Sequence, residues 1–377
     1  MNLAPFRDPG IAAWLIAEIH AAQKHPWVLM ETCGGQTHAI LRLGLDQLLP
    51  RELELVHGPG CPVCVTPAGL IDQAIALAGC PGVLLATFAD MMRVPGSAGT
   101  LFEARAAGAE VHMVYSALDA LALARRMPKR EVVFFAIGFE TTAPGSALAV
   151  ARARREGIRN FSLLMAHVLV PPAMRALLQS PDNRVQGYLA AGHACAILGW
   201  EPYEALAAEF GVPIVVTGFE AADLLRGILR LVQMLEAGEA RVENAYERVV
   251  RREGNTRAQA QMDGVFEVCA REWRGIGLLP DSGLQLRPEW AAWDAQRKFG
   301  DLASPSAAAS ECISGEILQG LKKPPACPAW GGRCTPAHPL GAPMVSGEGA
   351  CAAYYTYQYI PEEEGPARHA LPEGLTR

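Results

Sequence analysis

The sequence of 377 residues contains no apolar run that approaches the roughly 20 residues needed to cross a bilayer. It has no block of lysine and arginine, and its formal net charge of −6 gives no electrostatic footprint for DNA or RNA. The apolar stretch over residues 11–17 stops at Glu18 without a signal-cleavage pattern. We therefore expect a cytoplasmic protein that binds neither nucleic acid nor a membrane.

Nucleotide-binding motifs are also missing. Residues 136–144 (AIGFETTAP) follow an expected strand and supply backbone donors, hydroxyls and a carboxylate. Their glycine spacing matches neither a Walker loop nor a dinucleotide fingerprint, so the segment indicates no nucleotide site.

Ten cysteines are present, and a disulfide framework is not expected because cytoplasmic thiols are kept reduced. Cys80, Cys195 and Cys269 stand alone in mostly apolar sequence, where a cysteine usually packs as a small hydrophobic residue. The other seven fall in three groups within sequence rich in glycine and proline, so they need a chemical explanation.

Apolar β-branched runs alternate with helical patterns from residue 27 to about 236, which is typical of parallel sheets covered by helices. The expected strands span residues 27–31, 53–56, 83–88, 111–115, 131–137, 161–165 and 213–217, and the expected helices include 68–77 and 221–235. The pattern predicts an α/β fold with two tandem Rossmann-like domains, residues 27–128 and 129–238.

The rest of the chain differs in character. Charge density rises from residue 240, and residues 241–252 and 256–273 are expected to be helical. Beyond Pro305 the sequence has too few apolar residues to form a stable core without a covalent cross-link or a bound metal. We expect residues 239–377, together with 1–26, to form a third, α+β domain.

The C-terminal segment carries one group of four cysteines: Cys312, Cys327, Cys334 and Cys351. Their spacing is wide and unequal and includes no Cys-x2-Cys knuckle, the feature common in structural zinc sites. A [4Fe-4S] cluster suits this spacing better because its four irons are spread apart, and zinc is the alternative.

Residues 31–38 (ETCGGQTH) place Cys33 between an expected strand and a helix. A sulfur at a helix N-terminus is favoured as thiolate, which suits a nucleophile or a metal ligand. The alternative is a tight turn in which Cys33 only packs. His38, five residues on, is expected to be a hydrogen-bonded structural residue.

Residues 57–67 (HGPGCPVCVTP) carry Cys61 and Cys64 just ahead of an expected helix, with Thr66 as N-cap and Pro67 as its first residue. This placement favours a reversible disulfide, and half of a zinc site is the alternative. Both cysteine loops would leave the carboxyl ends of parallel strands, so they are expected to face one cleft.

Two further side chains are candidates. Asp90 follows another expected strand and could orient a ligand, shuttle a proton or cap a helix. His193 follows Gly192, and structural and functional roles for it are about equally expected.

Four segments together resemble the HypD family of hydrogenase maturation proteins. They are residues 31–38, 58–64, 137–144 and 347–355 (GEGACAAYY), in fixed order along nearly the whole chain. The resemblance implies a redox-active assembly scaffold and not a conventional turnover enzyme. The Fe(CN)2CO group of [NiFe]-hydrogenase would be built transiently on this scaffold. The expected partners are a HypC-like chaperone and a HypE-like cyanide donor, and the chain on its own is expected to be a monomer. It also implies two α/β domains and a third domain with a [4Fe-4S] cluster.

The resemblance assigns roles by position. Cys33 matches the thiolate that holds the nascent iron, Cys61 and Cys64 match a redox pair, and His193 matches a histidine near that iron. The chain departs from the family at residues 190–191, where Ala-Ala replaces the common Cys-Pro, and at Ala89, where glycine is common. The residues alone leave two rivals: a thioredoxin-like disulfide oxidoreductase and a zinc-stabilised interaction protein.

Overall fold

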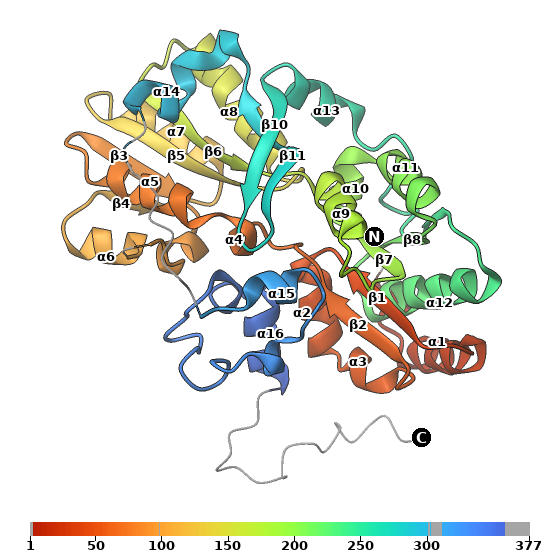
Figure 1. The fold of residues 1–377 in the computed structure, drawn as a ribbon. Coiled ribbons are helices and arrows are strands. Elements are labelled where there is room, and N and C mark those ends of the chain that lie inside the picture. The colour runs from red at the N-terminus through yellow and green to blue at the C-terminus, as the bar shows by residue number, and fades with distance from the viewer. Residues whose placement is uncertain (1–2, 98, 301, 303–310, 359–377) are drawn as a thin grey trace.

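The computed structural model describes residues 3–97, 99–300, 302 and 311–358 (Figure 1). Its strands are β1 (Trp27–Glu31), β2 (Leu53–His57), β3 (Val83–Thr87), β4 (Val111–Met113), β5 (Glu131–Gly138), β6 (Phe161–His167), β7 (Gly187–Ala191), β8 (Ile214–Thr217), β9 (Val242–Asn244), β10 (Phe266–Trp273) and β11 (Gly277–Leu286).

Sixteen α-helices lie in the described residues: α1 (Pro9–Ala22), α2 (Gly34–Arg42), α3 (Leu45–Leu48), α4 (Pro62–Val65), α5 (Ala68–Ala78), α6 (Leu101–Ala106), α7 (Ala117–Arg126), α8 (Ala143–Arg155), α9 (Val170–Gln179), α10 (Gly192–Leu198), α11 (Glu201–Phe210), α12 (Ala221–Ala237), α13 (Thr256–Asp263), α14 (Ala295–Phe299), α15 (Ser314–Leu318) and α16 (Ala350–Gln358). Short 3-10 helices are η1 (Ala4–Phe6), η2 (Ala89–Arg93), η3 (Pro288–Trp293), η4 (Pro324–Ala326) and η5 (Ala342–Met344).

Two parallel sheets form the framework, which confirms the predicted α/β class. One sheet has the order β2-β1-β7-β8-β9, and the other has the order β4-β3-β5-β6. Each sheet thus takes strands from both sides of residue 128, where the sequence had suggested a boundary between two units. Strands β10 and β11 form a separate antiparallel hairpin that runs between the two sheets to α4 (Figure 1).

Helices cover both faces of each sheet because the strands are apolar on both faces. On the first sheet, Leu29 and Leu189 face a core shared with α1, α2 and α12. Met30 and Tyr188, the next residues along the same strands, face a second core that continues into the other sheet. This continuous core joins the two sheets, and it includes Cys61 and Cys64.

Several predicted elements need correction. The predicted helix over 241–252 is wrong, because that stretch contains edge strand β9 and a turn. The predicted helix over 256–273 ends at Asp263, since the chain then enters β10, whose exposed and buried residues alternate. Helix α5 begins at Ala68 with Pro67 as its N-cap, so the predicted cap at Thr66 is shifted by one residue. Strand β7 was not predicted at all.

Candidate functional site

Cys33 is the N-cap residue of α2 and is separated from the end of β1 by Thr32 alone, so it lies between a strand and a helix as the sequence predicts. Its N–H donates to Glu31 Oε2 at 2.9 Å, and its carbonyl accepts from the N–H groups of Gln36 and Thr37. The side chain is buried against Ala191 and Ala194. Ala191 and Ala194 thus occupy the space beside the sulfur.

The protonation state of Cys33 differs from the expectation for a helix N-terminus. Burial raises the pKa of the thiol above its ordinary range, and the nearby carboxyls of Glu31 and Glu348 raise it further. These effects outweigh the backbone N–H groups of Gln36 and Gly35, which lower the pKa. In the free protein Cys33 is therefore a thiol, and a bound cation would have to displace its proton.

His193, in the first turn of α10, faces the Cys33 sulfur. Its Nδ1 and Nε2 lie 3.7 and 3.9 Å from Cys33 Sγ. The ring packs against Phe219, with centroids 5.2 Å apart. The side chain is partly open to solvent, yet loss of hydration lowers its pKa, so the ring is neutral near pH 7 and offers a lone pair. The structure therefore brings these two predicted residues together.

Two acidic residues, Asp90 and Glu348, influence the site electrostatically. Asp90 lies in η2, and its charge raises the pKa of Glu348, although burial of Glu348 is the larger cause. Glu348 in turn acts on the thiol of Cys33. The site thus combines a soft sulfur, an imidazole and two acidic groups.

Cys61 and Cys64 form a disulfide across the one-turn helix α4. Cys61 is the N-cap of α4, and its Sγ accepts from the N–H of Cys64 at 3.2 Å. The preceding Gly60 lies directly against the Cys33 loop: a Cβ on it would stand 2.3 Å from the backbone nitrogen of Cys33. The carbonyl of Gly60 also accepts from Gly34 N–H at 3.0 Å. The two cysteine loops are therefore in direct backbone contact.

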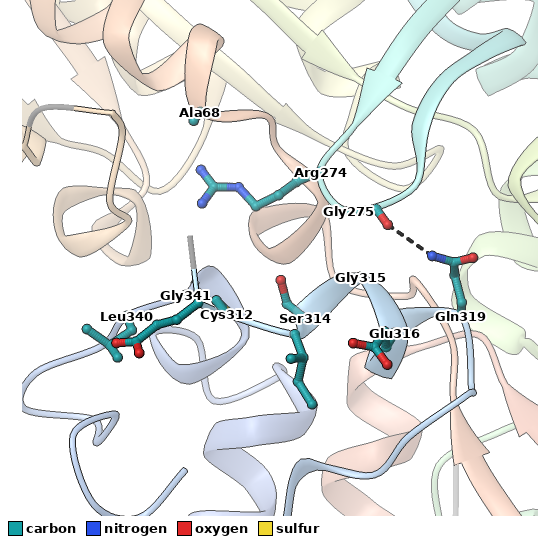
Figure 2. A pocket seen from close by; sticks show the side chains of 12 residues that line it. Ala68, Arg274, Gly275, Cys312, Ser314, Gly315, Glu316, Gln319, Leu340 and Gly341 are labelled. Atoms are coloured by element: carbon teal, nitrogen blue, oxygen red, sulfur yellow. Dashed lines mark hydrogen bonds between the residues drawn. The ribbon is translucent and has the colours of Figure 1, made fainter. Parts of the chain in front are cut away.

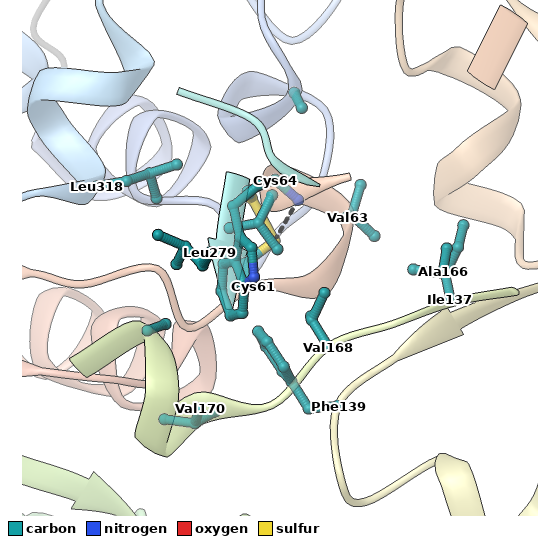
Figure 3. Close-up of a cluster of buried hydrophobic side chains, with 14 of the residues drawn as sticks. Cys61, Val63, Cys64, Ile137, Phe139, Ala166, Val168, Val170, Leu279 and Leu318 are labelled. Carbon is teal, nitrogen blue, oxygen red and sulfur yellow. Dashed lines mark hydrogen bonds between the residues drawn. A yellow bond between two sulfur atoms is a disulfide. The ribbon is translucent and has the colours of Figure 1, made fainter. Parts of the chain in front are cut away.

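The disulfide is enclosed by apolar side chains from distant segments. Figure 3 draws Phe139, Leu279 and Leu318 around the pair, and all three belong to the same core. Both cysteines are almost completely buried. Water is therefore kept from the sulfur–sulfur bond on most sides.

A buried network of hydrogen-bonded side chains stabilises the Cys33 loop. Glu31 and His57 are register partners on β1 and β2, and Glu31 Oε1 lies 2.6 Å from His57 Nδ1. Thr37 Oγ1 donates to the same carboxylate oxygen. His57 Nε2 lies 3.0 Å from the hydroxyl of Tyr354 on α16. The network fixes the backbone of Cys33 and connects it to the helix that begins beside Cys351.

The four C-terminal cysteines are neighbours in space. The other three raise the pKa of Cys351 electrostatically, after burial as the largest cause. Cys334 Sγ accepts from Leu340 N–H at 3.4 Å, and a Cβ on Gly341 would stand 2.3 Å from Cys312 Sγ. Within the described residues, no three His, Cys, Asp or Glu side chains are grouped tightly enough to hold a single metal ion.

The remaining candidates fall outside these groups. Cys195 is buried in the core, Cys80 packs against it, and Cys269 is half-buried on β10. His38 is held by the carbonyl of Gly347 and the hydroxyl of Tyr357, as expected for a structural histidine.

Glu140, in the segment 136–144, is fully buried. Its Oε1 accepts from Val170 N–H at 2.8 Å, and its Oε2 has no hydrogen-bond partner among the described residues. Burial raises the pKa of this carboxyl to about 7. It is therefore a proton-carrying group near neutral pH.

Sequence reasoning missed three groups of the site: Glu31, His57 and Glu348. Glu31 and His57 could have been identified from the sequence, because each is a polar residue at the end of an apolar strand. Glu348 sits in a glycine-flanked loop far from Cys33 in sequence, and only the packing of that loop on Gly34 brings it near.

None of the described helices is both long and apolar enough to span a membrane.

In comparisons with known proteins, residues 11–358 match the family described as "HypD: Hydrogenase formation hypA family". The chain is 48% identical over 364 residues to hydrogenase maturation factor HypD of Rhodobacter capsulatus, covering 93% of this chain and 97% of that protein. It is 44% identical over 361 residues to hydrogenase maturation factor HypD of Escherichia coli strain K12, covering 94% and 97%.

Proposed function

The chain belongs to the HypD family of hydrogenase formation proteins, and from this membership we propose that it is a redox-active scaffold for building the Fe(CN)2CO group of [NiFe]-hydrogenase. A role in hydrogenase maturation follows from the family. The scaffold chemistry is inferred from the arrangement of Cys33, His193 and the Cys61–Cys64 disulfide.

One observation carries the proposal: the Cys33 sulfur faces His193 while its loop touches the loop of the disulfide. Iron that carries cyanide and carbon monoxide is a soft centre, for which a thiolate is a suitable ligand. On binding, Cys33 must lose its proton, and the neutral ring of His193 is placed to accept it or to approach the iron itself. Glu31 holds the Cys33 backbone fixed during this exchange.

The Cys61–Cys64 pair would act as a local store of two electrons in its reduced form. Reduction breaks the Sγ–Sγ bond of Cys61 and Cys64, and each sulfur then takes up an electron and can take up a proton. Its apolar enclosure limits access by water and by unrelated thiols. The contact between Gly60 and the Cys33 loop keeps this store beside the nascent iron.

The four C-terminal thiols fit a [4Fe-4S] cluster in number, ligand type and neighbourhood. Cys312, Cys327, Cys334 and Cys351 would each bind one iron, and the N–H of Leu340 bonds to the Cys334 sulfur in the manner that tunes such centres. When bound, the cluster would supply electrons singly. Their wide, unequal spacing in the sequence, without a Cys-x2-Cys knuckle, suits a cluster better than one zinc ion.

The partners are proposed from the family resemblance. A HypC-like chaperone would share the iron, and a HypE-like protein would supply the cyanide groups. The rival functions, a thioredoxin-like oxidoreductase and a zinc-stabilised interaction protein, gain no support from the relatives, which are named as hydrogenase maturation factors.

The test is an infrared spectrum of the anaerobically purified protein together with its HypC-like partner. We expect bands of iron-bound cyanide and carbon monoxide, and we expect Cys33→Ala to remove them while the visible absorption of the cluster stays. Cys80→Ala is the matched control, since Cys80 lies outside the site. Unchanged bands in Cys33→Ala would refute the assigned ligand, and a colourless protein with stoichiometric zinc would refute the scaffold.

A further inference from the structure

The tip of the β10–β11 hairpin touches both redox-related segments of the chain. Arg274, directly after β10, donates its backbone N–H to the carbonyl of Val65 at 2.8 Å. Val65 is the last residue of α4 and follows Cys64 directly. The hairpin tip is thus fixed to the turn that carries the disulfide.

The Arg274 side chain strengthens this attachment. Its Nε donates to the carbonyl of Thr66 at 2.7 Å, and its Nη2 donates to the carbonyl of Pro95 at 2.9 Å. Because both acceptors are neutral carbonyl oxygens, these bonds hold the guanidinium in place without cancelling its charge. The positive charge is therefore fixed beside the end of α4.

The opposite side of Arg274 faces the C-terminal cysteine segment. Figure 2 shows it beside a cavity of about 510 Å³ whose lining also includes Ala68, Cys312 and Gly341. The guanidinium and the Cys312 thiol lie close enough to interact electrostatically. One cation thus stands between the disulfide turn and a cysteine of the tail.

The hairpin tip also fits closely against helix α15, which follows Cys312. A Cβ on Gly275 would lie 2.6 Å from Gly315 Cα, and a Cβ on Gly315 would lie 2.5 Å from the carbonyl oxygen of Gly275. Gln319 donates its side-chain amide to the same carbonyl at 3.0 Å. Two glycines therefore allow a contact distance that no other residue permits.

Acidic groups near Arg274 are Asp72 and Glu272, with Glu311 and Glu316 in the cavity lining. Asp72 accepts from the N–H of Ser97, so it is already engaged in holding its own loop. Glu311 pairs with Arg333 at 2.6 Å and Glu316 pairs with Lys322 at 2.8 Å, so these two carboxylates are neutralised by cations other than Arg274.

We propose that Arg274 is a positioning residue that joins the disulfide turn to the Cys312 segment, and that its charge stabilises the reduced form of Cys61 and Cys64. Reduction breaks the Sγ–Sγ bond, takes two electrons from a low-potential one-electron donor acting twice, and takes one proton from solvent, which leaves one thiol and one thiolate. A fixed cation nearby favours this product because it carries one more negative charge than the disulfide. The inference rests on the proposed redox role of the pair.

The test is an anaerobic equilibrium titration of the folded, full-length protein with dithiothreitol redox buffers. Thiols are trapped with a maleimide, and the peptide bearing Cys61 and Cys64 is quantified by mass spectrometry. For Arg274→Gln we expect the equilibrium constant for reduction to fall about tenfold, which for a two-electron couple is a potential about 30 mV more negative. Arg274→Lys keeps the charge and should stay within about threefold of wild type.

Arg287→Gln is the matched control, because Arg287 also donates to two backbone carbonyls but lies at the far end of the hairpin. It should leave the potential unchanged. Arg274→Met supplies a second neutral side chain in case glutamine prevents folding. An unshifted potential in the neutral variants, or equal shifts in Arg274→Lys and Arg274→Gln, would overturn the inference.

The outcomes separate the inference from the function that underlies it. A wild-type pair that stays oxidised at every dithiothreitol ratio would overturn the redox role and this inference together. A wild-type pair that titrates normally, beside neutral variants with the same potential, would overturn the role of Arg274 alone.

Discussion

The hydroxyl of Tyr354 lies 3.0 Å from Nε2 of His57 and connects the cysteine-rich segment to the sheet that presents Cys33. The two rings also meet edge to face, with centroids 5.2 Å apart. His57 passes this connection to Glu31, which holds the N–H of Cys33. The position of Cys33 therefore depends on a helix more than 300 residues later in the chain.

Tyr354→Phe should lower the free energy of unfolding by about 1–2 kcal/mol, because a buried nitrogen of His57 loses its partner. Thermal unfolding followed by circular dichroism under anaerobic conditions measures the change. Tyr115→Phe is the control, since the Tyr115 side chain is 98% exposed. Equal unfolding temperatures for wild type and Tyr354→Phe would argue against a structural role for this bond.

Cys61→Ser should abolish hydrogenase maturation while the fold is kept. Serine is close in size to cysteine, and the buried position keeps its apolar neighbours, but no disulfide can form. Hydrogenase activity in a strain that carries only this variant of the maturation gene is the measurement. Cys269→Ser, at a half-buried position outside the site, should mature the enzyme normally. Normal activity in the Cys61→Ser strain would count against a redox pair.

Gly60→Ala should separate the two cysteine loops. The added methyl group would lie 2.3 Å from the backbone of Thr32 and Cys33, so one loop must move, at a cost of about 1–3 kcal/mol in unfolding free energy. Loss of the infrared bands with iron retained in the tail would be the diagnostic result. Gly145→Ala, a helix position with open space around it, should be neutral or slightly stabilising. Wild-type bands in Gly60→Ala would mean that loop contact is dispensable.

Glu140 gives a pH dependence with a defined sign. Burial raises its pKa from 4.5 to about 7, so between these values the unfolded chain releases a proton that the folded chain retains. Stability from this group is present below pH 4.5 and is lost as the pH rises to about 7. Glutamine cannot ionise, so Glu140→Gln does not lose stability over this pH range. The free energy of unfolding of Glu140→Gln minus that of wild type should therefore grow by about 3 kcal/mol between pH 4.5 and about 7 and then level off.

Unfolding temperatures of wild type and Glu140→Gln at several pH values test this prediction. Glu54→Gln is a control of opposite sign, because a hydrogen bond from Arg184 lowers the pKa of Glu54. Its effect should be complete above pH 5 and should shrink only in more acidic solution. Parallel pH profiles for Glu140→Gln and wild type would show that the carboxyl is not buried in solution.

Each of the four tail cysteines should be required for bound iron. Replacing any one with serine should reduce the content from about four iron per chain and bleach the brown colour of the anaerobically purified protein. The four residues are Cys312, Cys327, Cys334 and Cys351. Colorimetric iron and acid-labile sulfide assays measure this, with Cys80→Ser as the variant that should keep full content. Full iron content in a tail variant would remove that cysteine from the ligand set.

Local signals predicted much of the framework. Strands β1, β2, β3, β5, β6 and β8 lie where apolar runs placed them, because buried parallel strands need such runs. Strand β7 was missed because Gly187 and two alanines give it weak strand propensity, and its place between β1 and β8 stabilises it instead. Strand order could not be predicted, since it depends on pairing between segments far apart in sequence.

The candidate site, like the fold, was predictable where local sequence patterns mark it and not where distant segments pack together. Cys33, Cys61 and Cys64 were identified because each interrupts a pattern within a few residues of a strand end. Glu348 and Arg274 were not, since each reaches its position through packing of a distant loop or hairpin. The ionisation of Cys33 was misjudged because burial depth is a property of the assembled fold.

The interleaved sheets also determine the order in which the site appears during synthesis. Strands β1 and β2 leave the ribosome first, but β7, which pairs with β1, follows only after all four strands of the other sheet. The contact of Cys33 with His193 can therefore form only after β7 has been synthesised. The helix that carries Tyr354 follows near the end of translation. A ribosome-bound chain therefore lacks the contact between Cys33 and His193 until β7 and α10 have been made, and it lacks the support of Tyr354 until synthesis is almost finished.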